Sequence, residues 1–149
     1  MWQASWFGEF PNRRGVNVIA VDAANCTMQE WHNFDTFRSD YNCIRLRHYL
    51  WTLSSGTVLV GVSCDEASNQ LRCALSTLRA FGADVSDVGY RGAWAFVAEK
   101  GDPSKTVLDK ELTEAAAYVR QPRIIVSFRG EYSANFFRLS DVSSVGKLK

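Results

Sequence analysis

The sequence lacks an excess of charge of either sign. Lysine and arginine total 17, aspartate and glutamate total 16, and the formal net charge is +1. Proteins that bind nucleic acid usually present a clear excess of basic residues to the phosphates. The near-neutral balance therefore argues against nucleic acid as a partner.

Long hydrophobic runs are also missing. No apolar stretch approaches the roughly 20 residues that a membrane-spanning helix needs. The first residues, MWQASWFGEFPNRR, do not have the basic-then-apolar order of a secretion signal. We therefore expect no membrane insertion. We also expect a chain that is either the mature protein or one whose secretion signal has been removed.

Catalytic and metal-binding motifs are absent as well. The sequence contains no G-x-S-x-G, no H-E-x-x-H, no P-loop and no G-x-G-x-x-G. It has no C-x-x-C pair, and its two histidines lie at no zinc-ligand interval from the cysteines. The sequence therefore predicts a protein that is not an enzyme and that uses no cofactor and no metal.

The sequence contains only four cysteines, an even number. The candidates for disulfides are Cys26, Cys43, Cys64 and Cys73. Two disulfides in any of three connectivities would suit an exported protein, and a glycosylation sequon at residues 25–27 agrees with export. Reduced, buried thiols in a cytosolic protein are the alternative.

The length and composition fit one globular domain. The 149 residues are 46% hydrophobic and 22% charged, which is enough apolar material for a single core. Apolar runs and alternation predict strands at residues 16–22, 30–36, 57–63, 95–98, 123–128 and 134–139. Apolar residues at helical spacing predict helices at residues 40–53, 65–81 and 104–121.

The stretch GYRGAWAFVAEKG, residues 89–101, combines a strand with side chains suited to recognition. Tyr90, Arg91 and Trp94 lie within five residues of one another. Flat aromatic faces and a guanidinium suit sugars, carboxylates or a protein hot spot, and packing in the core is the alternative role. Asp65 follows a buried strand, so it either lies where α/β sheets tend to bind ligands or caps the next helix.

Five segments in the same order resemble the ILEI/PANDER domain, also called the GG domain. They are RGVNV (14–18), FDT (34–36), TVLVGVSCDEAS (57–68), residues 78–83 and YRGAWAFV (90–97). The resemblance covers residues 14–101, and residues 102–149 are an unmatched C-terminal extension that completes the fold. Domains of this family occur in secreted cytokine-like proteins, in cell-surface hyaluronidase-related proteins and in the stem of a protein O-mannose N-acetylglucosaminyltransferase.

The resemblance implies an α/β fold, a compact sandwich of two β-sheets flanked by short helices, within a single domain at residues 1–149. It also implies a secreted, extracellular protein. Carried over position by position, the sugar site of the transferase stem falls on Asp65 and Arg91, with Tyr90 in place of a tryptophan and Trp94 as a direct match. Asp35 is a further candidate for carbohydrate binding.

These inferences predict a secreted, non-catalytic lectin for glycans or glycoproteins with a GlcNAc- or galactose-type sugar. A carboxylate and a guanidinium can bridge vicinal hydroxyls while an aromatic ring covers the apolar face of a sugar. The alternative is a cytokine-like ligand of a cell-surface receptor, which exposed aromatics at Trp2, Trp6 and Phe7 would favour. Because shallow sugar sites bind weakly, a homodimer would raise the avidity.

Overall fold

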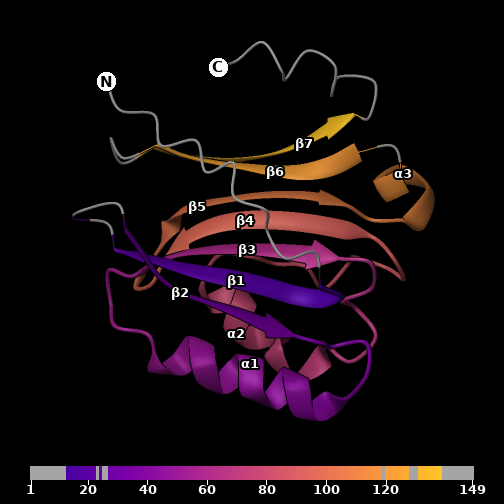
Figure 1. The fold of residues 1–149 in the computed structure, drawn as a ribbon, viewed down its shortest axis with the longest axis horizontal. Helices are drawn as coiled ribbons and strands as arrows, with labels where there is room; N and C mark the ends of the chain where they lie inside the picture. Colours follow the sequence, from indigo (N-terminus) through magenta and orange to yellow (C-terminus); the bar gives the residue numbers. More distant parts are fainter. Residues whose placement is uncertain (1–12, 23, 25–26, 119, 128–130, 139–149) are drawn as a thin grey trace.

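The computed structural model describes residues 13–22, 24, 27–118, 120–127 and 131–138. These residues form a five-stranded antiparallel sheet, a separate two-stranded hairpin and a few short helices (Figure 1). The strands of the larger sheet are β1 (Gly15–Asp22), β2 (Thr27–Phe34), β3 (Val58–Cys64), β4 (Ala93–Glu99) and β5 (Asp102–Glu111). The other elements are α1 (Asp40–Thr52), a 3-10 turn at Arg72–Ala74, α2 (Leu75–Ala80), α3 (Glu114–Tyr118), β6 (Arg120–Ser127) and β7 (Glu131–Arg138). Among the described residues, no helix is long and apolar enough to cross a membrane.

The middle of the sheet is built from the apolar runs. The strand order is β2-β1-β3-β4-β5, so β1, β3 and β4 each have a neighbour on both sides. Within β3 every residue from Val58 to Ser63 is buried, as expected for a strand that is covered on both faces. The strands predicted at residues 16–22, 30–36, 57–63 and 95–98 are confirmed within a few residues.

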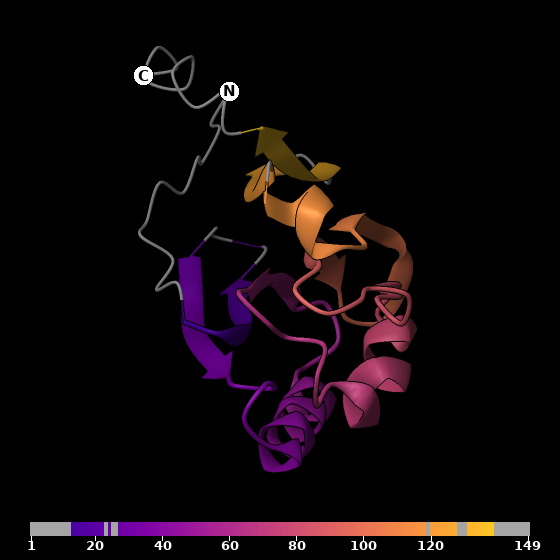
Figure 2. The same cartoon turned by 90° about the vertical axis from the view of Figure 1, so that its right-hand side faces the viewer.

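Each face of the sheet carries its own apolar core. Leu59 and Phe96 face the helices and pack with residues such as Leu46, Leu50 and Leu78. Neighbouring strand residues point the other way, and Val58, Val60, Val62, Ala95 and Val97 form a second cluster. Helices α1 and α2 lie on the opposite side of the sheet from the β6–β7 hairpin (Figures 1 and 2), and the hairpin contacts β4 and β5.

A sandwich of two sheets is not confirmed. The described residues show one five-stranded sheet with helices on one face, and a hairpin of only two strands on the other. The α/β class of the prediction holds, because helices and strands share the same core.

The helix predicted at residues 104–121 is wrong for most of its length. Residues Asp102–Glu111 instead form β5, which pairs antiparallel with β4, and α3 is a short helix at Glu114–Tyr118. Val107 packs on the cluster behind the sheet, whereas the neighbouring Leu108 packs on the helix side. Pairing satisfies the backbone groups along the edge of β4, and this tertiary gain outweighs the local helical spacing.

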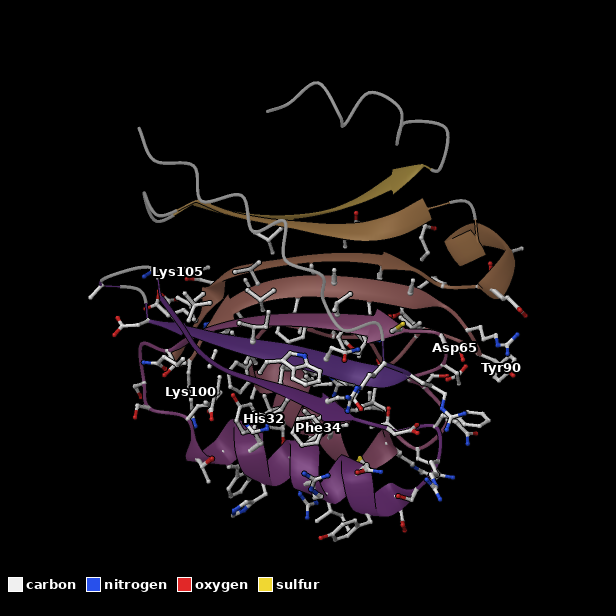
Figure 3. The ribbon with its side chains drawn as sticks, viewed as in Figure 1. His32, Phe34, Asp65, Tyr90, Lys100 and Lys105 are labelled. Carbon is white, nitrogen blue, oxygen red and sulfur yellow. A yellow bond between two sulfur atoms is a disulfide. The ribbon has the colours of Figure 1, made fainter. Side chains whose placement is uncertain are left out.

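Strand β2 packs its inner side chains on α1. His32 and Phe34 both point from β2 toward this helix (Figure 3). Their rings lie 4.6 Å and 5.8 Å from the ring of Tyr49. His32 therefore contributes to the packing between β2 and α1, although its side chain is still 37% exposed.

Helix α1 is joined to the rest of the fold near both of its ends. Lys100, in the turn after β4, donates hydrogen bonds from Nζ to the carbonyl oxygens of Leu50 (2.8 Å) and Trp51 (2.6 Å). This cation satisfies carbonyls that the last turn of a helix leaves free. A disulfide between Cys43 and Cys73 joins α1 to the 3-10 turn.

The Cys43–Cys73 disulfide fixes the pairing of two of the four cysteines. Cys43 and Cys73 are bonded, whereas Cys64 is a free, half-buried thiol at the end of β3. Burial raises the pKa of the Cys64 thiol. Cys26 lies outside the described residues, as do Trp2, Trp6 and Phe7.

The β3–β4 contact leaves no room for a methyl group at Gly61. A Cβ there would lie 2.4 Å from Cε1 of Phe96, the residue opposite it in the ladder. We expect Gly61→Ala to lower the free energy of unfolding by about 1–3 kcal/mol, because an extra methyl overpacks this core. Urea denaturation measures the loss. The cost should shrink when Phe96 is replaced by leucine, and an equal cost in both backgrounds would contradict the proposed clash.

Candidate functional site

The candidate site lies where β3 and β4 separate at one end of the sheet. Their ladder runs to the pair Val62 and Ala95. Beyond it the hydroxyl of Ser63 accepts a hydrogen bond from the backbone N–H of Trp94 (2.9 Å) and donates to its carbonyl oxygen (3.3 Å). The two chains then diverge into loops that carry Asp65 and Arg91, so the site is built on rigid strand ends.

A buried carboxylate joins these two loops. Glu66 is 1% exposed, and its Oε1 accepts hydrogen bonds from the backbone N–H and hydroxyl of Ser68 and from the backbone N–H of Asn69. Its Oε2 accepts a hydrogen bond from the backbone N–H of Arg91. Four donors therefore surround one anionic group, which is how a buried charge is made tolerable.

Asp65 and Arg91 share an uncommon backbone conformation. Their φ angles are 56° and 53°, and they are the non-glycine residues with positive φ in the described part of the chain. This left-handed conformation costs roughly 1–2 kcal/mol per residue for an L-amino acid. The Glu66 hydrogen bond to Arg91 and the packed strands on either side compensate for that strain.

The helix predicted to begin at Asp65 is wrong at its start. The first helical turn begins at Arg72, and Asp65 lies in the loop that precedes it. A positive φ is incompatible with an N-cap, which takes an extended backbone conformation. Asp65 is therefore free to present its side chain at the surface.

The Asp65 and Arg91 side chains meet there. Nε of Arg91 lies 3.3 Å from Oδ1 of Asp65, and its NH1 donates a 3.2 Å hydrogen bond to Oε1 of Glu114. The Arg91 guanidinium carbon is 5.4 Å from the centre of the Tyr90 ring. Asp65 and Tyr90 project from the same end of the molecule (Figure 3).

This group is accessible to a ligand. The side chains of Arg91 and Asp65 are 45% and 49% exposed, and Tyr90 is 56% exposed. The Glu114 carboxylate, with smaller effects of Tyr90 and Asp65, raises the pKa of Arg91. We call Asp65, Tyr90 and Arg91 the loop cluster. It offers carboxylate acceptors, guanidinium donors and an aromatic face within one surface region.

Trp94 does not belong to the loop cluster. It is 1% exposed, and its ring stacks on Phe96 in the core with 5.8 Å between ring centres. Successive residues of a strand point to opposite faces, and the start of β4 turns this side chain inward. The sequence placed Trp94 among the sugar-stacking candidates, but its ring is not accessible to a ligand.

Asp35 is engaged by a different arginine. Arg14 donates from Nε to Oδ1 of Asp35 at 3.0 Å and from NH2 to Oδ2 at 2.7 Å. The Arg14 guanidinium also lies over the ring of Phe37, at 4.5 Å from its centre. The hydrogen bond to Asp35, with a smaller effect of Asp65, raises the pKa of Arg14, so this pair lies within electrostatic reach of the loop cluster.

Gly92 lets the Arg91 loop pack tightly on β5. A Cβ at this position would lie 2.5 Å from Cγ1 of Val88 and 2.7 Å from the carbonyl oxygen of Glu111. In this chain only glycine fits, because the loop backbone and β5 are in direct contact.

Sequence reasoning missed Glu66 and Glu114. Glu66 was visible only as the neighbour of Asp65, and its hydrogen bond to a residue 25 positions away has no local signal. Glu114 belongs to the region without a quoted family match and reaches Arg91 because β5 and α3 bring it there. Among the described residues, no three His, Cys, Asp or Glu side chains are grouped so as to hold a metal ion.

Comparison with known proteins identifies the family. A family model described as "Interleukin-like EMT inducer" matches residues 14–102, which include the whole loop cluster. The chain belongs to the interleukin-like EMT inducer (ILEI) family. This match confirms the resemblance drawn from the short segments at residues 14–101.

Two curated relatives agree with this assignment. The "Cell migration-inducing and hyaluronan-binding protein" of Mus musculus is 29% identical over 137 residues, which cover 91% of this chain and 10% of the relative. The Homo sapiens protein of the same name is 32% identical over 110 residues, which cover 72% of this chain and 8% of the relative. This ILEI chain therefore spans about a tenth of the length of the curated relatives it matches.

Glu66 should be the residue whose charge matters most for the stability of the site. We expect Glu66→Gln to lower the free energy of unfolding by about 2–3 kcal/mol, because an amide NH₂ would face a backbone donor in a buried position. Chemical denaturation measures the loss, and hydrogen exchange at the Arg91 amide should become faster. The matched control Glu114→Gln, at a side chain 55% exposed, should cost less than about 0.5 kcal/mol. Equal losses for the two variants would contradict the role of Glu66.

The Asp35–Arg14 ion pair should stabilise the fold only where Asp35 is ionised. Arg14 holds the pKa of Asp35 below its usual value. Such a carboxylate contributes stability above its unfolded pKa of about 4, which is lost as the pH falls through the folded pKa. At pH near 7 we expect Asp35→Asn to lower the free energy of unfolding by at most about 1 kcal/mol, since the pair is partly exposed. Urea denaturation at decreasing pH should show this difference disappearing below about pH 4. A difference that persists at the lowest pH would contradict the assignment.

Proposed function

We propose that this ILEI chain is a non-catalytic carbohydrate-binding domain whose sugar site is the loop cluster. The observation that carries the proposal is the left-handed backbone of Asp65 and Arg91, two half-exposed residues on different loops. Strain of this kind is retained mainly at ligand sites, where it fixes side chains in position. Here the buried Glu66 carboxylate secures one of the two residues from below the surface.

The chemistry of the loop cluster suits a sugar. Vicinal hydroxyls can donate to the Asp65 carboxylate and accept from the Arg91 guanidinium, and the exposed Tyr90 ring can cover the apolar C–H face. Both charged side chains also pair with each other at 3.3 Å, so ligand binding exchanges one exposed ion pair for direct hydrogen bonds. An exposed pair is worth little, so this exchange is inexpensive in free energy.

The relatives support a glycan that contains N-acetylglucosamine. Both are named as hyaluronan-binding proteins, and hyaluronan alternates N-acetylglucosamine with a sugar acid. Arg91 supplies guanidinium donors that can pair with the carboxylate of the sugar acid, while Asp65 and Glu114 supply acceptors for hydroxyls beside it. We therefore place hyaluronan oligosaccharides first among the candidate ligands, followed by glycans that end in N-acetylglucosamine or galactose.

We also place the protein outside the cell. The Cys43–Cys73 disulfide supports this location, because disulfides persist in oxidising compartments. A cytokine-like ligand of a cell-surface receptor is the second candidate function, and the family description as interleukin-like favours it. The two functions differ in the ligand that the loop cluster would contact.

Substitution by glycine separates the sugar site from the fold. Glycine adopts positive φ without strain, so Asp65→Gly and Arg91→Gly should change the free energy of unfolding by at most about 1 kcal/mol. We expect each variant to bind hyaluronan oligosaccharides at least about tenfold more weakly, a loss of about 1.4 kcal/mol in binding free energy. A glycan array followed by NMR titration of the hits measures the binding.

The control variant is Lys105→Gln, which lies at the other end of the sheet (Figure 3) and should bind like the unmodified chain. Absence of glycan binding by the unmodified chain would reject the lectin function in favour of a receptor ligand. Binding that both glycine variants retain would place the sugar site elsewhere on the molecule.

A further inference from the structure

Helix α1 carries a second apolar surface that faces solvent. Its inner side, with Cys43, Leu46 and Leu50, is buried in the core. On its outer side Tyr41, Ile44 and Trp51 are 65%, 46% and 72% exposed. Within residues 13–22, 24 and 29–116, the other exposed large hydrophobic side chains are Tyr90 and Leu112. Such a concentration on one element is typical of an interaction surface.

The exposed residues lie along one line of the helix. Tyr41, Ile44, His48 and Trp51 follow each other at intervals of three, four and three residues, and His48 is exposed as well. This spacing repeats that of the a and d positions through which one helix packs on another. We call these four residues the outer face of α1.

The fold holds the outer face rigidly. Trp51 donates a hydrogen bond from Nε1 to Oγ1 of Thr77 at 3.2 Å, which orients its exposed ring toward α2. The Cys43–Cys73 disulfide and the Lys100 hydrogen bonds to the last turn restrain the helix itself. A partner would therefore bind a surface that is already ordered, which lowers the entropic cost of binding.

Positive charge flanks the outer face. Arg45 and Arg47 occupy the positions beside it, equivalent to e and g of a coiled coil. The neighbouring helical segments at residues 72–80 add Arg72 and Arg79, and Asp40 is the one acidic residue within α1, the 3-10 turn and α2. The helical layer is thus basic although the chain as a whole is nearly neutral.

We propose that the outer face of α1 binds an acidic amphipathic helix of a protein partner. The apolar line of the partner helix would pack on Tyr41, Ile44 and Trp51, and its flanking carboxylates would pair with Arg45 and Arg47. A polysaccharide has no use for an aliphatic contact such as Ile44. In an antiparallel pair with a second copy, Arg45 and Arg47 would each face their own counterparts, and like charges disfavour that contact.

The expected interaction is transient. Helix α1 has 13 residues and presents four outer side chains, which is a small surface compared with the roughly 1,200 Å² of a stable interface. Recognition of this kind uses few contacts and strong charge selection. It also leaves the loop cluster free for a sugar.

Two synthetic helical peptides provide the test. Both carry leucine at the a and d positions, one with glutamate and the other with lysine at e and g. Titrated into the isotope-labelled full chain at low salt, the glutamate peptide should shift the NMR signals of residues 40–52 and bind at least about tenfold more tightly than the lysine peptide.

Three variants define the surface. Ile44→Asp should abolish binding and leave the fold intact, since this side chain is exposed. Reversal of both flanking charges, Arg45→Glu with Arg47→Glu, should reverse the preference between the two peptides. Lys105→Glu on β5 is the matched charge reversal away from α1, and it should change neither affinity. Thermal unfolding and binding of hyaluronan oligosaccharides by Ile44→Asp serve as independent readouts.

Three results would overturn the proposal. Equal affinity for the two peptides would show that binding does not depend on the flanking charges. Absence of NMR shifts in α1 would show that the peptide does not bind to the outer face. A concentration-dependent dimer in sedimentation that Ile44→Asp dissociates would identify a second copy of the chain as the occupant instead. These three measurements do not involve the loop cluster. They can therefore be interpreted even if the sugar-binding experiment fails.

Discussion

The carboxylate of Glu66 accepts hydrogen bonds from backbone N–H groups in two loops. These N–H groups lie outside the strands and take no part in the ladder of the sheet. The carboxylate holds the turn through Ser68 and Asn69 with one oxygen and the backbone of Arg91 with the other. The charge is only 1% exposed, so its desolvation is tolerable only while these donors remain in place. The distance between the β3 loop and the β4 loop therefore depends on this one side chain.

Strain at the surface is balanced by packing beneath it. Asp65 and Arg91 keep an unfavourable backbone conformation because Ser63, Glu66 and the buried Trp94 restrain the strand ends from which they project. The ring of Trp94, which the sequence predicted to stack on a sugar, instead packs on Phe96 in the core. The exposed aromatic side chain of the loop cluster is Tyr90.

Charge is distributed unevenly over a nearly neutral chain. The helical layer on one side of the sheet carries arginines, whereas the segment of β5 carries Asp102, Asp109 and Glu111 as well as Lys105 and Lys110. A balance of +1 excludes a broadly basic protein, but it says nothing about a local surface. The loop cluster and the outer face of α1 are consequently two separate surfaces with different chemistry.

Local patterns in the sequence determined much of this protein. Alternation and apolar runs located β1 to β4, helical spacing located α1, and the order of short segments identified the family. These features depend on neighbours a few residues apart. Asp65, Tyr90 and Arg91 could also be predicted as site candidates from the sequence, because the resemblance to a family motif does not require knowledge of their contacts.

Only the tertiary structure decided the rest. Residues 104–111 belong to a segment with helical spacing, yet they form part of β5 because the edge of β4 offers hydrogen bonds that a helix cannot use. The contact of Trp94 with Ser63, the pairing of Cys43 with Cys73 and the contact of Glu66 with Arg91 join residues 25 to 31 positions apart. The physical reason is that burial and hydrogen-bond satisfaction are properties of the assembled fold, whereas periodicity is a property of the chain.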